Sequence, residues 1–336
     1  MNAREWRSKL PRVLIAGIAV IAAIAIVSEI SSDRDVGGEL IVDVPTPAIE
    51  SKSWAVGQEP TGVIFDGERL WVAETGFGTV TSYGLEGQRL DTADVGGQPA
   101  VLASGRGFVW ALDTGDGSVT QLDADANVVR KFQVGLDPTG LVFFGDHLWV
   151  SDPIRGSVSK ISLQGALAQL LEIGVSPGAI TKTPEQVLVI DDETLTVTGI
   201  DQDGNLVGSF EYPGQIDIGD FEHIPGAPTA FLSTSDALWI AFGGIGQVMR
   251  LTPAGNFSSL TRVPTGHLAL AWNGNELWVV STDAATITRI SGTGTIVETH
   301  DIGGHPTSIA HDGNHGWVTD DEKNVLIQFT PVDLVP

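Results

Sequence analysis

Short apolar runs alternate with polar turns along most of the chain, and the alternation repeats at a constant spacing. Each repeat opens with an aliphatic residue, a Gly or Pro, and usually a Pro three residues later. Apart from one step of 51 residues before the fifth copy, successive copies of this opening lie 39 residues apart, at 56 (VGQEP), 95 (VGGQP), 134 (VGLDP), 173 (IGVSP), 224 (IPGAP), 263 (VPTGH) and 302 (IGGHP). We therefore divide the chain into seven repeats, counted from these openings.

Two apolar strands are predicted at fixed positions within each repeat. Fifteen residues after the opening stands a Trp in six repeats and Leu188 in the fourth, usually inside a run such as LWV. A second apolar run with a β-branched residue at its first position in most repeats follows nine residues later. A strand after the Pro and one leading into the next repeat bring the number to four. Four short strands in a repeat of this length are typical of a β-propeller blade.

The pattern predicts an all-β fold, a seven-bladed β-propeller of four-stranded blades over residues 49–336. The Trp set should form the core between blades. The seventh repeat ends at Pro336, before its fourth strand is complete, whereas residues 50–55 precede the first opening in the register of a fourth strand. We expect these two ends of the array to pair and to close the ring, which removes open sheet edges.

An N-terminal transmembrane helix is predicted to precede the propeller. Residues 13–27 are all apolar or Gly, and 13–30 reach roughly 27 Å as a helix, just enough to span a bilayer. Arg4, Arg7, Lys9 and Arg12 precede this run, which favours a cytoplasmic segment over residues 1–12 and a propeller outside the cytoplasmic membrane. Residues 31–48 form a linker. A cleaved signal peptide is the alternative, although small residues do not fall cleanly at a cleavage site.

The balance of charge and the absence of cysteine exclude several classes of function. The chain has 18 basic and 42 acidic residues, a net charge of -24, so a nucleic acid partner is not expected. It has no Cys, which excludes disulfides, thiolate metal sites and a Cys nucleophile. No phosphate loop or nucleophile constellation is found either.

The repeated sequences LWVAE and LWVSD, with GTVTSY or GSVSKI after them, resemble the streptogramin (virginiamycin B) lyase propellers and the related NHL and YVTN repeats. The resemblance covers about residues 50–330 and implies the fold. In the lyases a His near the start of one inner strand works with a Glu and a His in the next blade, beside Mg²⁺. The matching positions here are His267, Gly304 and Pro306, with His305 one residue out of phase. The acidic partner is missing, so the resemblance does not carry the lyase activity to this chain.

Acidic residues occur eighteen residues after the opening in five of the seven repeats. They are Glu74, Asp113, Asp152, Asp191 and Asp320, and Phe242 and Ser281 replace them in the fifth and sixth repeats. They could form a carboxylate ring that holds a hard cation, or each could cap the turn after its own strand, an interpretation that repetition favours. No cofactor is expected, but Mg²⁺ or Ca²⁺ remains a candidate, with Asp320 as the candidate metal-side carboxylate.

The last three repeats depart from the common pattern on one face of the predicted propeller. This handover face consists of the loops that carry the chain from one blade to the next and of the turns after the Trp strands. Pro225 and Pro264 replace Gly there, and residues 212–223 form an insertion. Clustered departures suggest a ligand or partner. The candidate binding residues are Phe221, His223, Phe242, His267 and His305; drift of the sequence is the alternative.

The leading hypothesis is a membrane-anchored, extracytoplasmic binding or scaffold module. It would be a subunit or accessory of a membrane-associated complex, with another membrane or extracytoplasmic protein as partner. The alternative is a metal-assisted lyase that opens a cyclic depsipeptide or related ester, with His267 or His305 as general base. A sensory module is a third candidate, which would signal through a membrane partner because the cytoplasmic segment is short.

The anchor hypothesis predicts that the mature protein retains its N-terminal segment and resists carbonate extraction from membranes. Intact-mass measurement of the purified mature chain checks this. A mature chain that begins after about residue 28 and is released to the medium would exclude the anchor.

Overall fold

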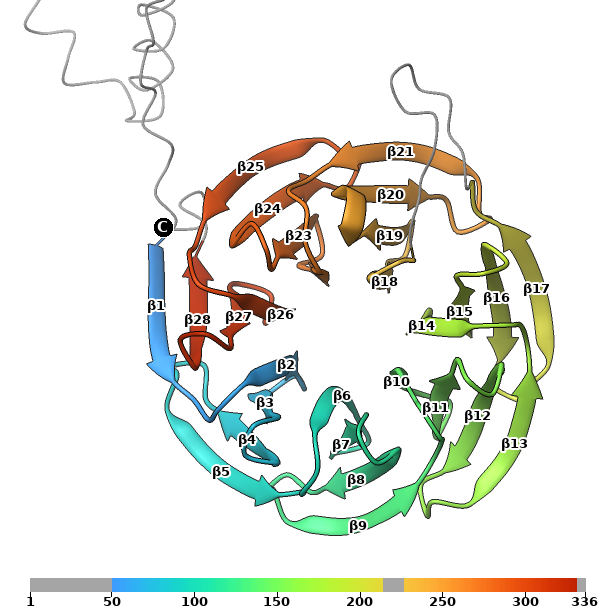
Figure 1. Ribbon diagram of the computed structural model, residues 1–336, viewed down its shortest axis with the longest axis horizontal. Helices are drawn as coiled ribbons and strands as arrows, with labels where there is room; N and C mark the ends of the chain where they lie inside the picture. The colour runs from blue at the N-terminus through green and yellow to red at the C-terminus, as the bar shows by residue number, and fades with distance from the viewer. Residues whose placement is uncertain (1–49, 214–226, 331–336) are drawn as a thin grey trace, which may run out of the picture. The chain divides into compact units, whose positions relative to one another are not determined.

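The computed structural model describes residues 50–213 and 227–330, and these residues form seven four-stranded antiparallel sheets around a central axis (Figure 1). The innermost strands are β2 (Pro60–Phe65), β6 (Pro99–Gly105), β10 (Gly140–Phe144), β14 (Pro177–Lys182), β18 (Ala230–Ser233), β22 (Leu268–Trp272) and β26 (Pro306–His311). The second strands are β3 (Leu70–Glu74), β7 (Phe108–Asp113), β11 (His147–Asp152), β15 (Gln186–Asp191), β19 (Leu238–Phe242), β23 (Glu276–Ser281) and β27 (Gly316–Asp320).

The outer half of each blade completes the predicted four strands. The third strands are β4 (Thr79–Tyr83), β8 (Ser118–Leu122), β12 (Ser157–Ser162), β16 (Thr196–Asp201), β20 (Gln247–Leu251), β24 (Thr286–Ser291) and β28 (Val325–Thr330). The outermost strands are β5 (Arg89–Asp94), β9 (Val128–Gln133), β13 (Leu167–Glu172), β17 (Leu206–Glu211), β21 (Phe257–Arg262), β25 (Ile296–Asp301) and β1 (Glu50–Ala55). One 3₁₀ turn, η1 (Gly243–Ile245), follows β19. The seven-bladed propeller is confirmed.

The first strand of the propeller closes its last blade. β1 pairs antiparallel with β28 from Glu50↔Thr330 to Ala55↔Val325. The backbone N–H of Val56 extends this pairing with a 3.0 Å hydrogen bond to the carbonyl of Asn324. Trp54 lies with its ring centroid 5.6 Å from that of Trp317. The predicted closure is therefore confirmed, and it gives blade seven the same four strands as the others.

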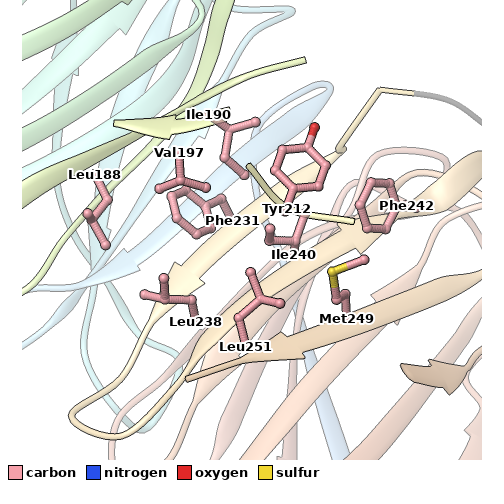
Figure 2. Packing of buried hydrophobic residues seen from close by; sticks show 10 residues of the cluster. All are labelled: Leu188, Ile190, Val197, Tyr212, Phe231, Leu238, Ile240, Phe242, Met249 and Leu251. Carbon is pink, nitrogen blue, oxygen red and sulfur yellow. The ribbon is translucent and has the colours of Figure 1, made fainter. Parts of the chain in front are cut away.

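The core lies between the blades, as predicted from the Trp positions. Trp110 of blade two stacks on Phe143 of blade three, with centroids 5.0 Å apart and planes 7° from parallel. Each residue of this set, including Leu188, is at most 3% exposed. Leu188 packs with Phe231 of the following blade, in the cluster that joins blades four and five (Figure 2). Burial of such large apolar side chains contributes about 1.5–3 kcal/mol each.

The inner strands crowd one another near the axis, which explains the small residues six positions after the openings. A Cβ on Gly62 would lie 2.4 Å from the carbonyl oxygen of Ala100 in the next blade, and one on Gly140 would lie 2.5 Å from Cγ2 of Ile180. Neither position has room for a side chain.

The handover loops and the turns between second and third strands lie on the same face, as expected. Thr75 donates its backbone N–H to the carbonyl of Glu59 at 3.0 Å, and Asp321 donates to that of His305 at 3.2 Å. The opposite face therefore carries the other hairpins, those between first and second strands and between third and fourth strands.

Several sequence-based predictions concern residues outside the described ranges. The cytoplasmic segment 1–12, the anchor 13–30 and the linker 31–48 lie there, as do Phe221, His223 and most of the insertion. Within 50–213 and 227–330, no helix is long and apolar enough to cross a bilayer.

Closure by β1 predicts different outcomes for two N-terminal deletions. Removal of residues 1–40 leaves β1 intact and should not change the melting temperature of the propeller. Removal of 1–56 exposes the edge of β28 and should lower the melting temperature by more than about 5 °C and promote self-association. Calorimetry and size-exclusion chromatography measure both. Equal melting of two monomeric truncations would contradict the proposed role of β1.

Candidate functional site

The acidic residues that end the second strands of blades one to four and seven are buried structural groups. Each is at most 3% exposed. In blades one to four the carboxylate accepts backbone N–H groups from the handover loop that enters its own blade, and in blades two to four also from the turn that follows it. We call this arrangement the carboxylate clip. The interpretation as caps of the following turn is confirmed for Asp113, Asp152, Asp191 and Asp320. The Glu74 carboxylate instead accepts from the hydroxyls of Thr79, Thr81 and Tyr83. All five carboxylates are buried, and an open ring for a cation would require them to be exposed.

Asp191 shows the clip in its most complete form. Its Oδ2 accepts the N–H groups of Val175 and Ser176 at 2.6 and 2.9 Å. Its Oδ1 accepts those of Glu193 and Thr194 at 3.1 and 2.9 Å. Burial disfavours the charge, but these hydrogen bonds outweigh burial and lower the pKa of Asp191 below its ordinary 3.8. The clip therefore contributes its full stability above about pH 3.8 and loses it as the pH falls through the lowered pKa.

Each clip requires a glycine in the handover loop that faces it. A Cβ would lie 2.0 Å from Oδ2 of Asp191 at Gly174, and 2.8 Å from Oδ2 of Asp152 at Gly135. The other three glycines of this kind, Gly57, Gly97 and Gly304, would likewise place a Cβ within 2.5 Å of a carboxylate atom. The acid and the glycine are therefore coupled. Where the carboxylate is absent, the facing position no longer has to lack a Cβ atom.

Blade six has lost both members of the clip, and blade five has lost its acid, which Phe242 replaces. Pro264 and Ser281 replace the glycine and the acid in blade six, and the hydroxyl of Ser281 donates to the carbonyl of Thr265 in the handover loop. The clustered departures in these blades thus have a structural cause. They do not by themselves indicate a ligand, as the sequence pattern had suggested.

Phe242 belongs to the core and not to a binding surface. It is 1% exposed, and its ring centroid lies 6.1 Å from that of Tyr212. Figure 2 shows it beside Met249 and Tyr212 within the blade-four and blade-five cluster. The prediction that Phe242 contacts a ligand is wrong, because the position occupied by buried carboxylates in other blades faces inward here too.

His267 and His305 lie on the handover face of adjacent blades, and both are exposed. The hydroxyl of Thr282 lies 3.1 Å from the carbonyl of His267 and 2.7 Å from that of Pro306, so it bridges the two histidine-bearing segments. Nδ1 of His305 lies 2.6 Å from Oδ1 of Asp321. Neighbouring atoms partly desolvate the imidazole of His267 and lower its pKa, and the negative charge of Asp283 offsets part of this decrease.

Asp320, the candidate metal-side carboxylate, has one oxygen bound by the backbone, while the other faces a lysine without a hydrogen bond. It is fully buried, its Oδ1 accepts the N–H of Lys323 at 2.9 Å, and its Oδ2 faces the Lys323 ammonium at 3.4 Å. Among the residues that the structure describes, no three His, Asp or Glu side chains converge in a way that could hold a metal ion. On the described part of the handover face, the histidine-bearing segments of blades six and seven therefore bring together His267, His305 and Asp321, without a set of three metal ligands.

Sequence reasoning missed an exposed aliphatic cluster on the handover face of blades three and four. Leu136, Ile154 and Val175 are 66%, 70% and 57% exposed. Leu136 and Val175 occupy corresponding positions in two handover loops, and Ile154 lies in the turn between β11 and β12. We name these three residues the aliphatic triad. Aliphatic residues at turn positions where other repeats carry Gly, Gln, Thr, Glu or Asp were the signal that could have found it.

Coupling within the clip predicts a non-additive pair of substitutions. Gly174→Ala should destabilise the wild-type propeller by about 2–3 kcal/mol, because the new Cβ displaces the Asp191 carboxylate. In an Asp191→Ser background, which reproduces the blade-six residue, the same change should cost less than about 1 kcal/mol. Urea denaturation followed by Trp fluorescence measures the cycle. Equal costs in the two backgrounds would refute the coupling.

Comparison with known proteins identifies relatives by fold and not by sequence. No protein-family model matches the chain, and no curated protein matches it in sequence. Virginiamycin B lyase from Staphylococcus aureus matches at a TM-score of 0.70 and 18% identity, over 85% of this chain and 100% of that one. BamB from Moraxella catarrhalis matches at 0.61 and 13% identity, over 85% and 98%. Hydrazine synthase of Kuenenia stuttgartiensis matches at 0.68 and 14%, over 89% and 99%. The chain thus has the propeller fold of the streptogramin lyase-like proteins, and at these identities the likeness shows the fold alone.

Proposed function

We propose that this protein is a binding module held on the outer side of a cytoplasmic membrane by its N-terminal segment, and that its handover face contacts a protein partner. The observation that carries the proposal is the aliphatic triad. Three exposed branched aliphatic side chains in loops of a rigid scaffold are a common form of interaction site.

The three backbone segments that carry the triad lie against one another. The Asp152 carboxylate accepts the backbone N–H of Leu136 in the handover loop and that of Arg155 in the turn after β11. The loop of Leu136 therefore lies against the turn that carries Ile154. Gly156 closes that turn, and a Cβ there would lie 2.7 Å from the carbonyl of Gly174 and 3.6 Å from that of Val175. The clips of blades three and four thereby fix the positions of the three segments relative to one another. A partner would meet a preorganised surface and would lose little entropy in ordering it.

Exposed carboxylates surround the triad. Asp137, Glu172 and Glu193 are exposed, and within the described residues none of them forms an ion pair. The cations nearby are already engaged, because Lys131 pairs with Asp113 and Asp116, and Arg155 pairs with Asp152. The complementary partner therefore presents apolar side chains flanked by Lys or Arg. Such a charge pattern raises association rates and rejects acidic partners more than it raises affinity.

The fold itself does not decide between binding and catalysis, since both enzymes and other proteins share it. The lyase alternative retains one favourable contact, the His305–Asp321 pair, which is the arrangement that orients a general base. It lacks the acidic residue in the matching phase, where Gly304 and Pro306 stand. We therefore give binding precedence over elimination chemistry.

The test replaces the aliphatic triad by Leu136→Ser, Ile154→Ser and Val175→Ser together in the full-length chain. A matched control carries Leu206→Ser, Val207→Ser and Leu167→Ser, which are similarly exposed but lie on outer strands. Melting temperatures should change little in both variants, because the side chains are on the surface. Proteins cross-linked to the chain in its native membrane should fall about tenfold for the triad variant alone. Equal yields from the two variants would contradict a binding role for the triad.

A further inference from the structure

A pocket on the opposite face, remote from the handover loops, lies between blades three and four. Its volume is about 430 Å³, and it is lined by Phe143, Phe144, Gly145, Lys182, Thr183 and Pro184. The lining comes from the ends of the inner strands β10 and β14, which are neighbours around the axis (Figure 1), and from the hairpins that follow them. Volumes in this range are typical of sites for small molecules.

The pocket combines an apolar wall with one cation. Lys182 donates from Nζ to the carbonyl of Phe143 at 2.6 Å, and the same Nζ lies 6.0 Å from the centre of the Phe143 ring. An ammonium has three N–H donors, so two remain for another acceptor. No carboxylate among the described residues pairs with Lys182. The neighbouring Asp146 is bound to Arg106 at 2.5 Å, and Glu185 is exposed and forms no ion pair there.

The Lys182 ammonium has no carboxylate partner among the described residues, as is also the case for exposed Lys52 and for buried Lys160, which instead lies over the Trp149 ring. Acidic residues outnumber basic ones by 42 to 18, and seven other described cations, Arg69, Arg106, Lys131, Arg155, Arg250, Arg289 and Lys323, are paired with Asp or Glu. Lys182 is an exposed residue, but neighbouring atoms partly desolvate its ammonium group, and this desolvation lowers its pKa. A bound anion would relieve that penalty, because an opposite charge at close range favours the charged form of the lysine.

The pocket is held in shape by contacts behind it. The ring of Phe143 stacks on Trp110, which is fully buried, so the aromatic wall is fixed from the core side. The hydroxyl of Ser233 in blade five donates to the carbonyl of Lys182 and fixes the backbone that carries the cation. Such preorganisation is what distinguishes a binding site from a flexible surface lysine.

We propose that this pocket binds a small amphipathic carboxylate, a molecule whose acid group meets Lys182 and whose aromatic or branched aliphatic body lies against Phe143, Phe144 and Pro184. The proposal is independent of the protein-binding role of the handover face. A free metabolite-sized acid and the C-terminal residue of a peptide present the same acid group to the pocket.

The experiment titrates the full-length chain with phenylacetate and with N-acetylphenylalanine, which stands for a peptide C-terminus, and measures binding by calorimetry. The uncharged phenylacetamide controls for apolar contact alone. At least one acid should bind with a dissociation constant at or below about 1 mM, and the amide should bind at least tenfold more weakly. Whichever acid binds more tightly identifies the source that the pocket prefers.

Two lysine variants separate the site from general charge effects. Lys182→Met keeps the apolar stem and should weaken binding of the acid at least tenfold. Lys52→Met removes an exposed lysine from β1 and should leave binding unchanged, which controls for the net charge of the chain. Equal affinity for acid and amide, or unchanged acid binding by Lys182→Met, would overturn the proposal. The proposal would also be overturned if neither acid bound at concentrations up to 10 times the expected dissociation constant of about 1 mM.

Discussion

The handover face depends on one interaction, the clip in which a buried carboxylate accepts backbone N–H groups from the loop that enters its blade. In blades two to four it also accepts N–H groups from the turn after its own strand, so a single side chain joins two loops that no β-ladder connects. A carboxylate that accepts several N–H groups remains ionised even when buried. The carboxylates that the sequence suggests as a cation ring are therefore buried and hydrogen-bonded within the protein. The side chains that the handover face exposes belong to neighbouring loop residues.

Most of the fold could be predicted from the sequence because a strict repeat multiplies weak local signals. The spacing of Trp71, Trp110 and their equivalents located the inter-blade core, and the missing fourth strand of the last repeat located the closure. Local patterns sufficed for these elements because strands in a propeller pair mainly with their sequence neighbours. The helix expected over 13–30 lies outside the described residues and remains a prediction.

The candidate sites were harder to predict, because they depend on which way a side chain faces and on which segments meet. Phe242 was assigned to the surface since acids occupy its position elsewhere, yet those acids are themselves buried. The pocket around Lys182 joins the ends of β10 and β14, segments a whole repeat apart, and its lining follows no motif. The aliphatic triad was present in the sequence, but only exposure distinguishes its residues from core aliphatics.

The β1–β28 pairing has a consequence for the order of events during synthesis. The strand that leaves the ribosome first completes the blade that leaves last, so a nascent chain carries β1 unpaired until nearly every other blade exists. Blades can form one after another from local hairpins, but the ring cannot close before β28 has been synthesised. The sequence of β1, ESKSWA, is polar apart from Trp54 and Ala55, which suits a strand that stays unpaired and exposed to solvent during synthesis. A protein arrested before its final repeat would remain an open arc, with blade one and the last finished blade both lacking a neighbour.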